Sequence, residues 1–167
     1  MKLFIPKMYQ KNIFSIDYQK LKENYKLIIF DLDNTIGSIK EEVCNQETTD
    51  FLNNLTKDFI VVVASNSYQE RVFNFTKNLK CDVFAFSLKP TLHVLRKIKE
   101  KYQIPYTKMV IIGDQIMTDI LVGNRKKLLT ILVDPIRNID FKITGINRYF
   151  EKIINKKNKI VKGEYYE

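Results

Sequence analysis

The sequence of 167 residues contains few of the residues that punctuate or cross-link a chain, with 5 glycines, 4 prolines and 2 cysteines. The low glycine and proline content, together with 45% hydrophobic and 28% charged residues, excludes a low-complexity or disordered protein. A chain of this length is sufficient for one domain with a full hydrophobic core. Cys44 and Cys81 lack the close spacing of a metal site, so we expect two free thiols in a reducing compartment.

Long apolar runs are missing as well. The longest uninterrupted runs have the length of a strand, which excludes a helix that spans a bilayer. The first six residues carry one lysine and a short apolar patch that Pro6 interrupts, which is too little for a secretory signal. We therefore expect a cytoplasmic protein.

Acidic residues are too few to balance the basic ones, 19 against 28, and the net charge is +9. Residues 137–162 hold eight basic and two acidic residues, a local balance of +6. This concentration favours a polyanionic partner, either an anionic membrane surface or nucleic acid, and a solvated basic face is the alternative. Residues 145–157 carry apolar side chains at helical spacing, which predicts a helix that lies on anionic lipid at the cytoplasmic face of a membrane or packs on the domain.

What the sequence does contain is an alternation of strand and helix patterns. Strands are predicted at residues 27–30, 59–64, 82–86, 109–112 and 130–133, and helices at 46–57, after Ser67, from Lys89 and at 118–127. The alternation predicts an α/β fold of three layers (α/β/α), with a doubly wound, Rossmann-like, mostly parallel five-stranded sheet. We expect one domain over residues 1–167, comprising an N-terminal arm with a short helix (1–24), a core (25–135) and a basic C-terminal segment (136–167).

Two helix starts and one helix face can be predicted more finely. Ser67 or Asn66 would cap the helix that follows the second strand. Proline is tolerated in a first helical turn, so Pro90 would open the next helix. The inner face of the helix after Ser67 is predicted to consist of Val72, Phe73, Thr76 and Leu79.

Carboxylates follow the ends of two predicted strands. Asp31 and Asp33 come directly after the first strand, Asp114 follows the fourth, and Asp119 begins the next helix. The carboxyl ends of parallel strands are where open α/β sheets bind ligands. Four carboxylates brought together would repel one another unless a cation compensates them, and their oxygens are the ligands that Mg²⁺ prefers. We therefore expect Mg²⁺ as the cofactor.

Groups that could bind an anion stand near the same edge. Ser65 and Asn66 end the second strand just before a helix, where hydroxyl and amide groups can donate to an anion. Lys89 adds a compact positive charge. Carboxylates, a hard cation, a hydroxyl and a lysine together fit phosphoryl transfer, in which the protein aligns the reactants and stabilises charge.

These residues also resemble a known family. The runs Asp31-Leu32-Asp33-Asn34-Thr35 and Gly113-Asp114 with Asp119, separated by Ser65 and Lys89, are similar in order and spacing to the four motifs of the haloacid dehalogenase (HAD) superfamily of phosphohydrolases. The resemblance implies that Asp31 is the nucleophile of an aspartyl-phosphate and that Asp33 acts as general acid and base.

The same resemblance implies roles for the remaining residues. Asp31, Asp33 (through its backbone carbonyl), Asp114 and Asp119 would hold Mg²⁺, with Asp119 supporting either the metal waters or Lys89. The residues that would bind the substrate phosphate or steady the loop around it are Thr35, Ser65, Asn66 and Lys89. Arg125 would contact substrate or offset the end of its helix.

The lengths of the segments between the motifs indicate which subclass of the family the chain resembles. Residues 36–59 and 67–88 are too short to hold a cap domain, so the chain resembles the capless subclass IIIA. More closely, it resembles the YqeG-type bacterial phosphatases and the mitochondrial phosphatidylglycerophosphate phosphatases, through Ile5-Pro6, Ser15–Asp17, Lys89-Pro90, Gly113–Asp119, Gly123–Arg125 and Asn147-Arg148. It departs from them at Ile36–Ser38 and at Ser67, which carry no catalytic role in the resemblance.

The resemblance implies an anionic lipid substrate, phosphatidylglycerophosphate, which would be hydrolysed to phosphatidylglycerol at a membrane surface. Two alternatives stand beside it. A phosphatase of nucleotides or polynucleotide ends is the first, because a basic surface also suits nucleic acid. A non-catalytic binding protein with the same fold is the second, although the intact set of acidic residues and Lys89 argues against it.

Overall fold

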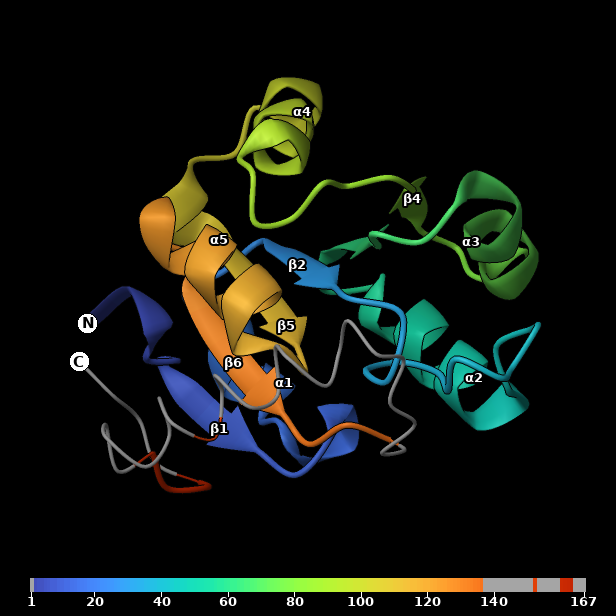
Figure 1. Cartoon of the computed structure of the whole chain (residues 1–167), viewed down its shortest axis with the longest axis horizontal. Coiled ribbons are helices and arrows are strands. Elements are labelled where there is room, and N and C mark those ends of the chain that lie inside the picture. The colour runs from blue at the N-terminus through green and yellow to red at the C-terminus, as the bar shows by residue number, and fades with distance from the viewer. Residues whose placement is uncertain (1, 137–151, 153–159, 164–167) are drawn as a thin grey trace.

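The centre of the fold is a parallel sheet, for which the described part of the chain provides six strands in the order β1-β6-β5-β2-β3-β4 (Figure 1). A computed structural model describes residues 2–136, 152 and 160–163. The strands are β1 (Met8–Gln10), β2 (Leu27–Phe30), β3 (Ile60–Ala64), β4 (Asp82–Phe84), β5 (Met109–Gly113) and β6 (Leu129–Val133). The helices are α1 (Tyr18–Lys22), α2 (Gln46–Leu55), α3 (Gln69–Thr76), α4 (His93–Tyr102) and α5 (Leu121–Arg125), with short turns η1 (Lys2–Phe4), η2 (Ile13–Ser15), η3 (Tyr106–Lys108) and the π-helical η4 (Ile116–Ile120).

The order of the strands reverses at β2. The chain proceeds from β2 outward to β3 and β4, and then crosses to the other side of β2 to form β5 and β6. Every paired strand is parallel to its neighbour. A reversal of this kind opens a crevice beyond the carboxyl ends of the central strands, which is where ligands bind in such sheets.

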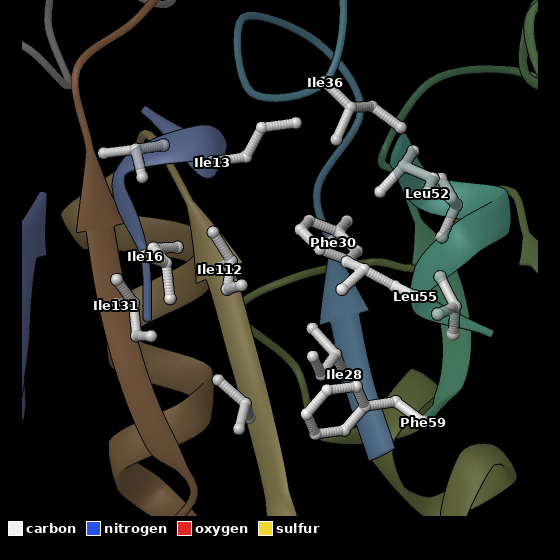
Figure 2. Close-up of a cluster of buried hydrophobic side chains, with 14 of the residues drawn as sticks. Ile13, Ile16, Ile28, Phe30, Ile36, Leu52, Leu55, Phe59, Ile112 and Ile131 are labelled. Carbon is white, nitrogen blue, oxygen red and sulfur yellow. The ribbon is translucent and has the colours of Figure 1, made fainter. Parts of the chain in front are cut away.

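Alternate residues of β2 face two different helix layers. Ile28 and Phe30 belong to the cluster that includes α2, α3 and the N-terminal arm, whereas Leu27 and Ile29 pack with α4 and α5. In Figure 1, α2 and α4 lie on opposite sides of β2. Figure 2 shows the first cluster, with side chains of α2, β2, β5, β6 and the arm turned toward one another. The predicted three-layer arrangement is confirmed, and β2 is apolar throughout because both of its faces are covered.

The predicted number of strands was wrong by one. The sheet gains β1 from the N-terminal arm, where Met8, Tyr9 and Gln10 pair with Ile131, Leu132 and Val133 of β6. A three-residue edge strand is too short to produce a recognisable period, and its pairing partner lies more than 120 residues away. The short helix expected in the arm is α1. That the whole chain forms one domain stays a prediction.

The start of α3 also differs from the prediction. Tyr68 occupies the N-cap position and makes no side-chain capping bond. The two predicted caps have other partners: Asn66 donates to the carbonyl of Lys89, and Ser67 donates to Asp33. Of the predicted inner face, Val72 and Thr76 are buried, but Phe73 is 47% exposed. Phe75 is buried in its place, at the i, i+3 spacing from Val72 that keeps two side chains on one helix face.

Pro90 does not open a helix. Helix α4 begins three residues later, at His93, with Leu92 at its N-cap. The helix predicted at 118–127 is displaced toward the N-terminus, because the π-helical η4 begins at Ile116 and α5 ends at Arg125. The ends of the other predicted elements agree within two residues, which is the usual uncertainty of such boundaries.

The segments between the first three motif strands contain no additional domain. Residues 36–59 form a loop and α2, and residues 67–88 form α3, β4 and their connections, so the expected absence of a cap is confirmed for these described segments.

Within the described residues no helix has the length and apolar character needed to cross a bilayer. Cys44 and Cys81 are both free thiols. The predicted helix at 145–157 lies outside the described residues, apart from Lys152.

The burial of Phe75, in place of the predicted Phe73, can be tested by measuring the stability of variants. We expect Phe75→Ala to lower the free energy of unfolding by about 3–5 kcal/mol, because it removes a fully buried ring from the core. The matched change Phe73→Ala should alter it by less than about 0.5 kcal/mol, since that ring is half exposed. Urea unfolding of both variants measures the difference, and equal losses would contradict the observed helix face.

Candidate active site

Hydrogen bonds of the sheet bring the motif residues to one edge. The amide of Asp31 donates to the carbonyl of Ile112 at 2.9 Å, so the first motif continues directly from β2 beside β5. The amide of Ser65 donates to the carbonyl of Phe84 at 3.0 Å and continues β3 in the same way. The carboxyl ends of three parallel strands therefore meet where the order of the sheet reverses.

Lys89 lies at the centre of this edge. Its Nζ is 2.6 Å from Asp31 Oδ1, 2.6 Å from Asp119 Oδ1 and 2.8 Å from the carbonyl oxygen of Ala64. An ammonium has three hydrogens to donate, so these contacts use all of them. The side chain is buried and thus fixes Asp31 and Asp119 relative to the end of β3.

Three buried carboxylates form a compact cluster. Asp31, Asp114 and Asp119 each offer an oxygen, and these oxygens all lie within 4.8 Å of one another. Gly113 makes this approach possible, because a Cβ at that position would lie 2.3 Å from Asp119 Cγ. The glycine of the fourth motif is therefore required by packing, independently of backbone conformation.

The cluster concentrates negative charge around one ammonium. Asp31, Asp114 and Asp119 bring three carboxylates together, and Lys89 contacts two of them, Asp31 and Asp119. Burial raises the pKa of Asp31 to about 7; Lys89 opposes this rise, while the carboxylates of Asp119 and Asp33 add to it. Burial disfavours the charged form of Lys89, but Asp119 and Asp31 outweigh it and raise the pKa of that ammonium above its ordinary value. An all-oxygen donor set of carboxylates that repel one another fits a hard divalent cation such as Mg²⁺.

Asp119 is engaged more with protein groups than with the predicted metal. Its Oδ1 accepts from Lys89, and its Oδ2 accepts from the hydroxyl of Thr118 at 3.3 Å and from the amide of Gln115 at 3.4 Å. Of the two roles left open for this residue, support of Lys89 is the one that these contacts favour. Asp31 and Asp114 are then the side chains best placed to hold the cation directly.

The side chain of Asp33 contacts two other residues, Ser67 and Arg71. Its Oδ2 accepts from Ser67 Oγ at 2.5 Å, and its Oδ1 accepts from Arg71 Nη2 at 2.5 Å and from Arg71 Nε at 3.2 Å. Asp33 is not part of the cluster of three carboxylates. Any contact it makes with a cation would be through its backbone carbonyl, as the resemblance implies.

Sequence reasoning missed Arg71. This residue on α3 also donates to the carbonyls of Ser38 at 3.3 Å and Glu41 at 2.9 Å, and so joins the loop after β2 to the helix after β3. The available signal was weak. The helix dipole favours acidic groups near the start of a helix, so a basic side chain there is unfavourable. An arginine at such a position suggests that a nearby carboxylate or carbonyl group compensates its charge.

A cavity of about 220 Å³ opens beside the cluster and contains most of the predicted residues. Its lining consists of Asp31, Asp33, Asn34, Ile39, Ser65, Asn66, Ser67, Lys89, Gln115 and Thr118. Ser65 Oγ accepts the amide of Ser67 at 3.1 Å, so its hydroxyl hydrogen can be donated to a ligand. Larger hollows occur elsewhere, for example one of about 450 Å³ beside α3, but it contains none of the motif residues.

The structure also places Asn66, Thr35 and Arg125, whose roles toward a substrate stay predictions. The amide of Asn66 exchanges two hydrogen bonds with the backbone of Lys89, at 2.8 and 2.9 Å, so it positions that residue. Thr35 is buried and does not line the cavity. Arg125 is exposed, donates to the carbonyl of Pro90 at 3.0 Å and is also absent from the lining.

Comparison with known proteins identifies relatives of this chain. A family model described as HAD-hydrolase-like matches residues 88–135. The chain is 35% identical over 155 residues to the probable phosphatase YqeG of Bacillus subtilis, covering 92% of this chain and 90% of that protein.

Two solved structures resemble the fold. A predicted HAD-like family hydrolase from Porphyromonas gingivalis superposes with a TM-score of 0.56 at 13% identity, covering 76% of this chain and 98% of that one. A HAD family enzyme from Bacteroides thetaiotaomicron, solved as a magnesium complex, gives a TM-score of 0.56 at 10% identity, covering 73% of this chain and 98% of that one. At these identities the two structures support the fold alone.

The acidic cluster predicts a stabilising response to Mg²⁺. Binding to the native state alone should add about 2.7 kcal/mol to the free energy of unfolding at a concentration roughly one hundred times the Kd. Thermal unfolding followed by circular dichroism, with and without MgCl₂, measures the effect without any substrate.

Asp114→Asn should abolish the response to Mg²⁺ while the protein still folds, since one carboxylate is removed from a repulsive group. The control is Asp58→Asn, whose exposed carboxylate pairs with Lys22 at 3.6 Å, and it should keep the full shift. A shift of undiminished size in Asp114→Asn would mean that the cation binds somewhere else.

Proposed function

The chain belongs to the HAD-like hydrolases, in the group that contains the probable phosphatase YqeG, and on that basis we propose that it is a Mg²⁺-dependent phosphatase that acts through an aspartyl-phosphate. One observation carries the proposal. Asp31 is buried at the end of the central strand, bonded to Lys89, grouped with Asp114 and Asp119, and open to a cavity. A carboxylate held beside a cation site in a cavity is the arrangement that covalent phosphoryl transfer requires.

Asp31 is the proposed nucleophile. Its Oδ1 accepts from Lys89, which leaves Oδ2 to attack the phosphorus of a phosphomonoester. As the new bond to Oδ2 forms, the bond between phosphorus and the ester oxygen breaks, and the leaving alkoxide takes a proton. Lys89 and the Ser65 hydroxyl stabilise the charge on the phosphoryl oxygens. Bound Mg²⁺ supplies further positive charge that neutralises the phosphoryl group.

Asp33 is the proposed proton carrier. It lines the same cavity as Asp31 and would protonate the leaving oxygen in the first step. In the second step the same carboxylate would take a proton from water, whose oxygen attacks phosphorus and releases inorganic phosphate and free Asp31. Ser67 donates to Oδ2 of this carboxylate and Arg71 donates to Oδ1, and these contacts fix its position in the cavity lining.

We propose a membrane phospholipid, phosphatidylglycerophosphate, as the substrate. The site has no cap in the described segments, so a large or surface-bound substrate can reach it. A cavity of about 220 Å³ holds a phosphate and a short polar head group but not a diacylglycerol. The net charge of +9 favours an anionic surface. The basic segment at 137–162, which the sequence links to lipid, falls mostly outside the described residues.

The proposed reaction can be tested on three substrates. With Mg²⁺, the full chain should release phosphate from p-nitrophenyl phosphate and, with higher kcat/KM, from phosphatidylglycerophosphate in mixed micelles. A 5′-nucleotide should be a poorer substrate than the lipid. Asp31→Asn should reduce every rate to background, because no nucleophile remains.

Asp50→Asn is the matched control, since Asp50 lies on α2 and contacts Gln46 at 2.8 Å, and it should retain full activity. Turnover that survives in Asp31→Asn would disprove the nucleophile. A preference for the nucleotide would instead support the alternative function, a phosphatase of nucleotides or polynucleotide ends.

The position of Asp33 should depend on Arg71. Arg71→Lys keeps the charge but loses the paired contacts from Nη2 and Nε. An alkyl leaving group needs its proton more than a nitrophenolate does. We therefore expect kcat to fall at least about tenfold for glycerol phosphate and much less for p-nitrophenyl phosphate, within the range of general acid catalysis.

Arg96→Lys on α4 serves as the control for the same substitution type. Equal losses on both substrates in Arg71→Lys would indicate a purely structural role for Arg71.

A further inference from the structure

Three large apolar side chains are exposed on the two segments that contain the cavity residues Ser65–Ser67 and Lys89. Tyr68, Phe86 and Leu88 are 57%, 55% and 56% exposed, and we refer to them as the mouth cluster. Single exposed apolar residues are common and need no explanation. These three are distinguished by their neighbours in the chain and the backbone: Tyr68 follows Ser67, Leu88 precedes Lys89, and the amide of Phe86 bonds to the carbonyl of Ser67. Tyr68 also lines the hollow beside α3.

Backbone hydrogen bonds hold the segments of the mouth cluster side by side. The amide of Phe86 donates to the carbonyl of Ser67 at 3.2 Å, and the amide of Ser87 donates to the carbonyl of Ser65 at 2.9 Å. Residues 65–68 and 86–89 therefore run next to each other across the ends of β3 and β4. The three residues thus belong to two adjoining segments that also carry the cavity residues Ser65, Ser67 and Lys89.

Two residues of the mouth cluster have a strained backbone. Phe86 and Leu88 have φ values of +46° and +54°, which bulky residues rarely adopt. Ser87 between them is buried, and its hydroxyl donates to Asn66 Oδ1 at 2.8 Å. Backbone strain of this kind clusters at active sites and ligand-binding segments. The buried serine anchors the loop, and its two apolar neighbours remain exposed.

We propose that the mouth cluster enters the apolar boundary of an anionic bilayer and contacts the acyl side of a lipid whose phosphate occupies the cavity. This inference rests on the proposed function and adds to it how the substrate is presented. Aromatic and leucine side chains are the types that partition into the interfacial region of membranes. The cavity cannot hold the acyl chains, so they must lie outside it, where the mouth cluster is found.

Charge favours a lipid surface over a second copy of this chain. The protein carries +9, so two copies would repel one another, whereas an anionic bilayer would attract the protein and orient it. Arg125 adds a local positive charge near the cluster, because it is exposed and donates to the carbonyl of Pro90, two residues beyond Leu88.

The test is a double variant of the full chain, Phe86→Asn with Leu88→Asn. Asparagine tolerates positive φ, so the change removes apolar surface without adding strain. We expect kcat/KM on soluble p-nitrophenyl phosphate to stay within about twofold, since neither side chain lines the cavity. On phosphatidylglycerophosphate in phosphatidylglycerol vesicles it should fall at least about tenfold, together with co-sedimentation, because the burial of apolar side chains is lost.

The control is Phe73→Gln, which removes an aromatic ring of similar exposure (47%) from α3 that does not line the cavity. It should leave vesicle binding and both rates unchanged. A fall on vesicles in the double variant that the control does not share supports the inference.

Three results would overturn the inference. Wild-type vesicle binding and turnover in the double variant would show that the cluster does not touch lipid. An equal loss on the soluble substrate would show that the cluster only shapes the cavity, and a change from dimer to monomer without a vesicle effect would assign it to a second copy. Failure of the wild type on p-nitrophenyl phosphate would refute the proposed function, while co-sedimentation, which needs no catalysis, would still decide the inference.

Discussion

The ammonium of Lys89 is the contact on which the arrangement of the site depends. It joins Asp31 at the end of β2, the carbonyl of Ala64 at the end of β3, and Asp119 in η4. A buried charge is tolerated only when its hydrogen bonds are satisfied, so the three partners and the lysine require one another. The side chain of Asn66 also positions Lys89, because it accepts from the backbone amide of Lys89 and donates to the backbone carbonyl of the same residue. The cluster is thus rigid before any ligand binds.

The carboxylates of the site fall into two electrostatic groups. The group around Lys89 gathers three carboxylates whose oxygens lie close together, and such an all-oxygen donor set is suited to a divalent cation. Asp33 is balanced by Arg71 and needs no metal. The two aspartates of one short motif therefore occupy different environments although they are only two residues apart.

Much of the fold was predictable because the decisive patterns are local. A continuous apolar run as short as Leu27–Phe30 favours a strand covered on both faces, and such runs between helical patterns imply a parallel three-layer sheet. The two errors have different causes. Strand β1 is defined by its pairing with β6, more than 120 residues away, so neighbouring residues do not reveal it. The burial of Phe75 in place of Phe73 follows a local spacing, i to i+3 from Val72, that the prediction overlooked.

For the site, the reactive residues can be recognised along the chain: Asp31, Asp33, Lys89, Asp114 and Asp119 stand in an order and spacing that strand ends impose. Residue type and position along the chain are local properties, so a motif records them. The partner of each side chain follows from the folded structure. It directed Asn66 to the backbone of Lys89, left Arg125 outside the cavity and brought Arg71 to Asp33. These contacts join segments that are far apart in the chain, and packing of the helices on the sheet determines which of them meet.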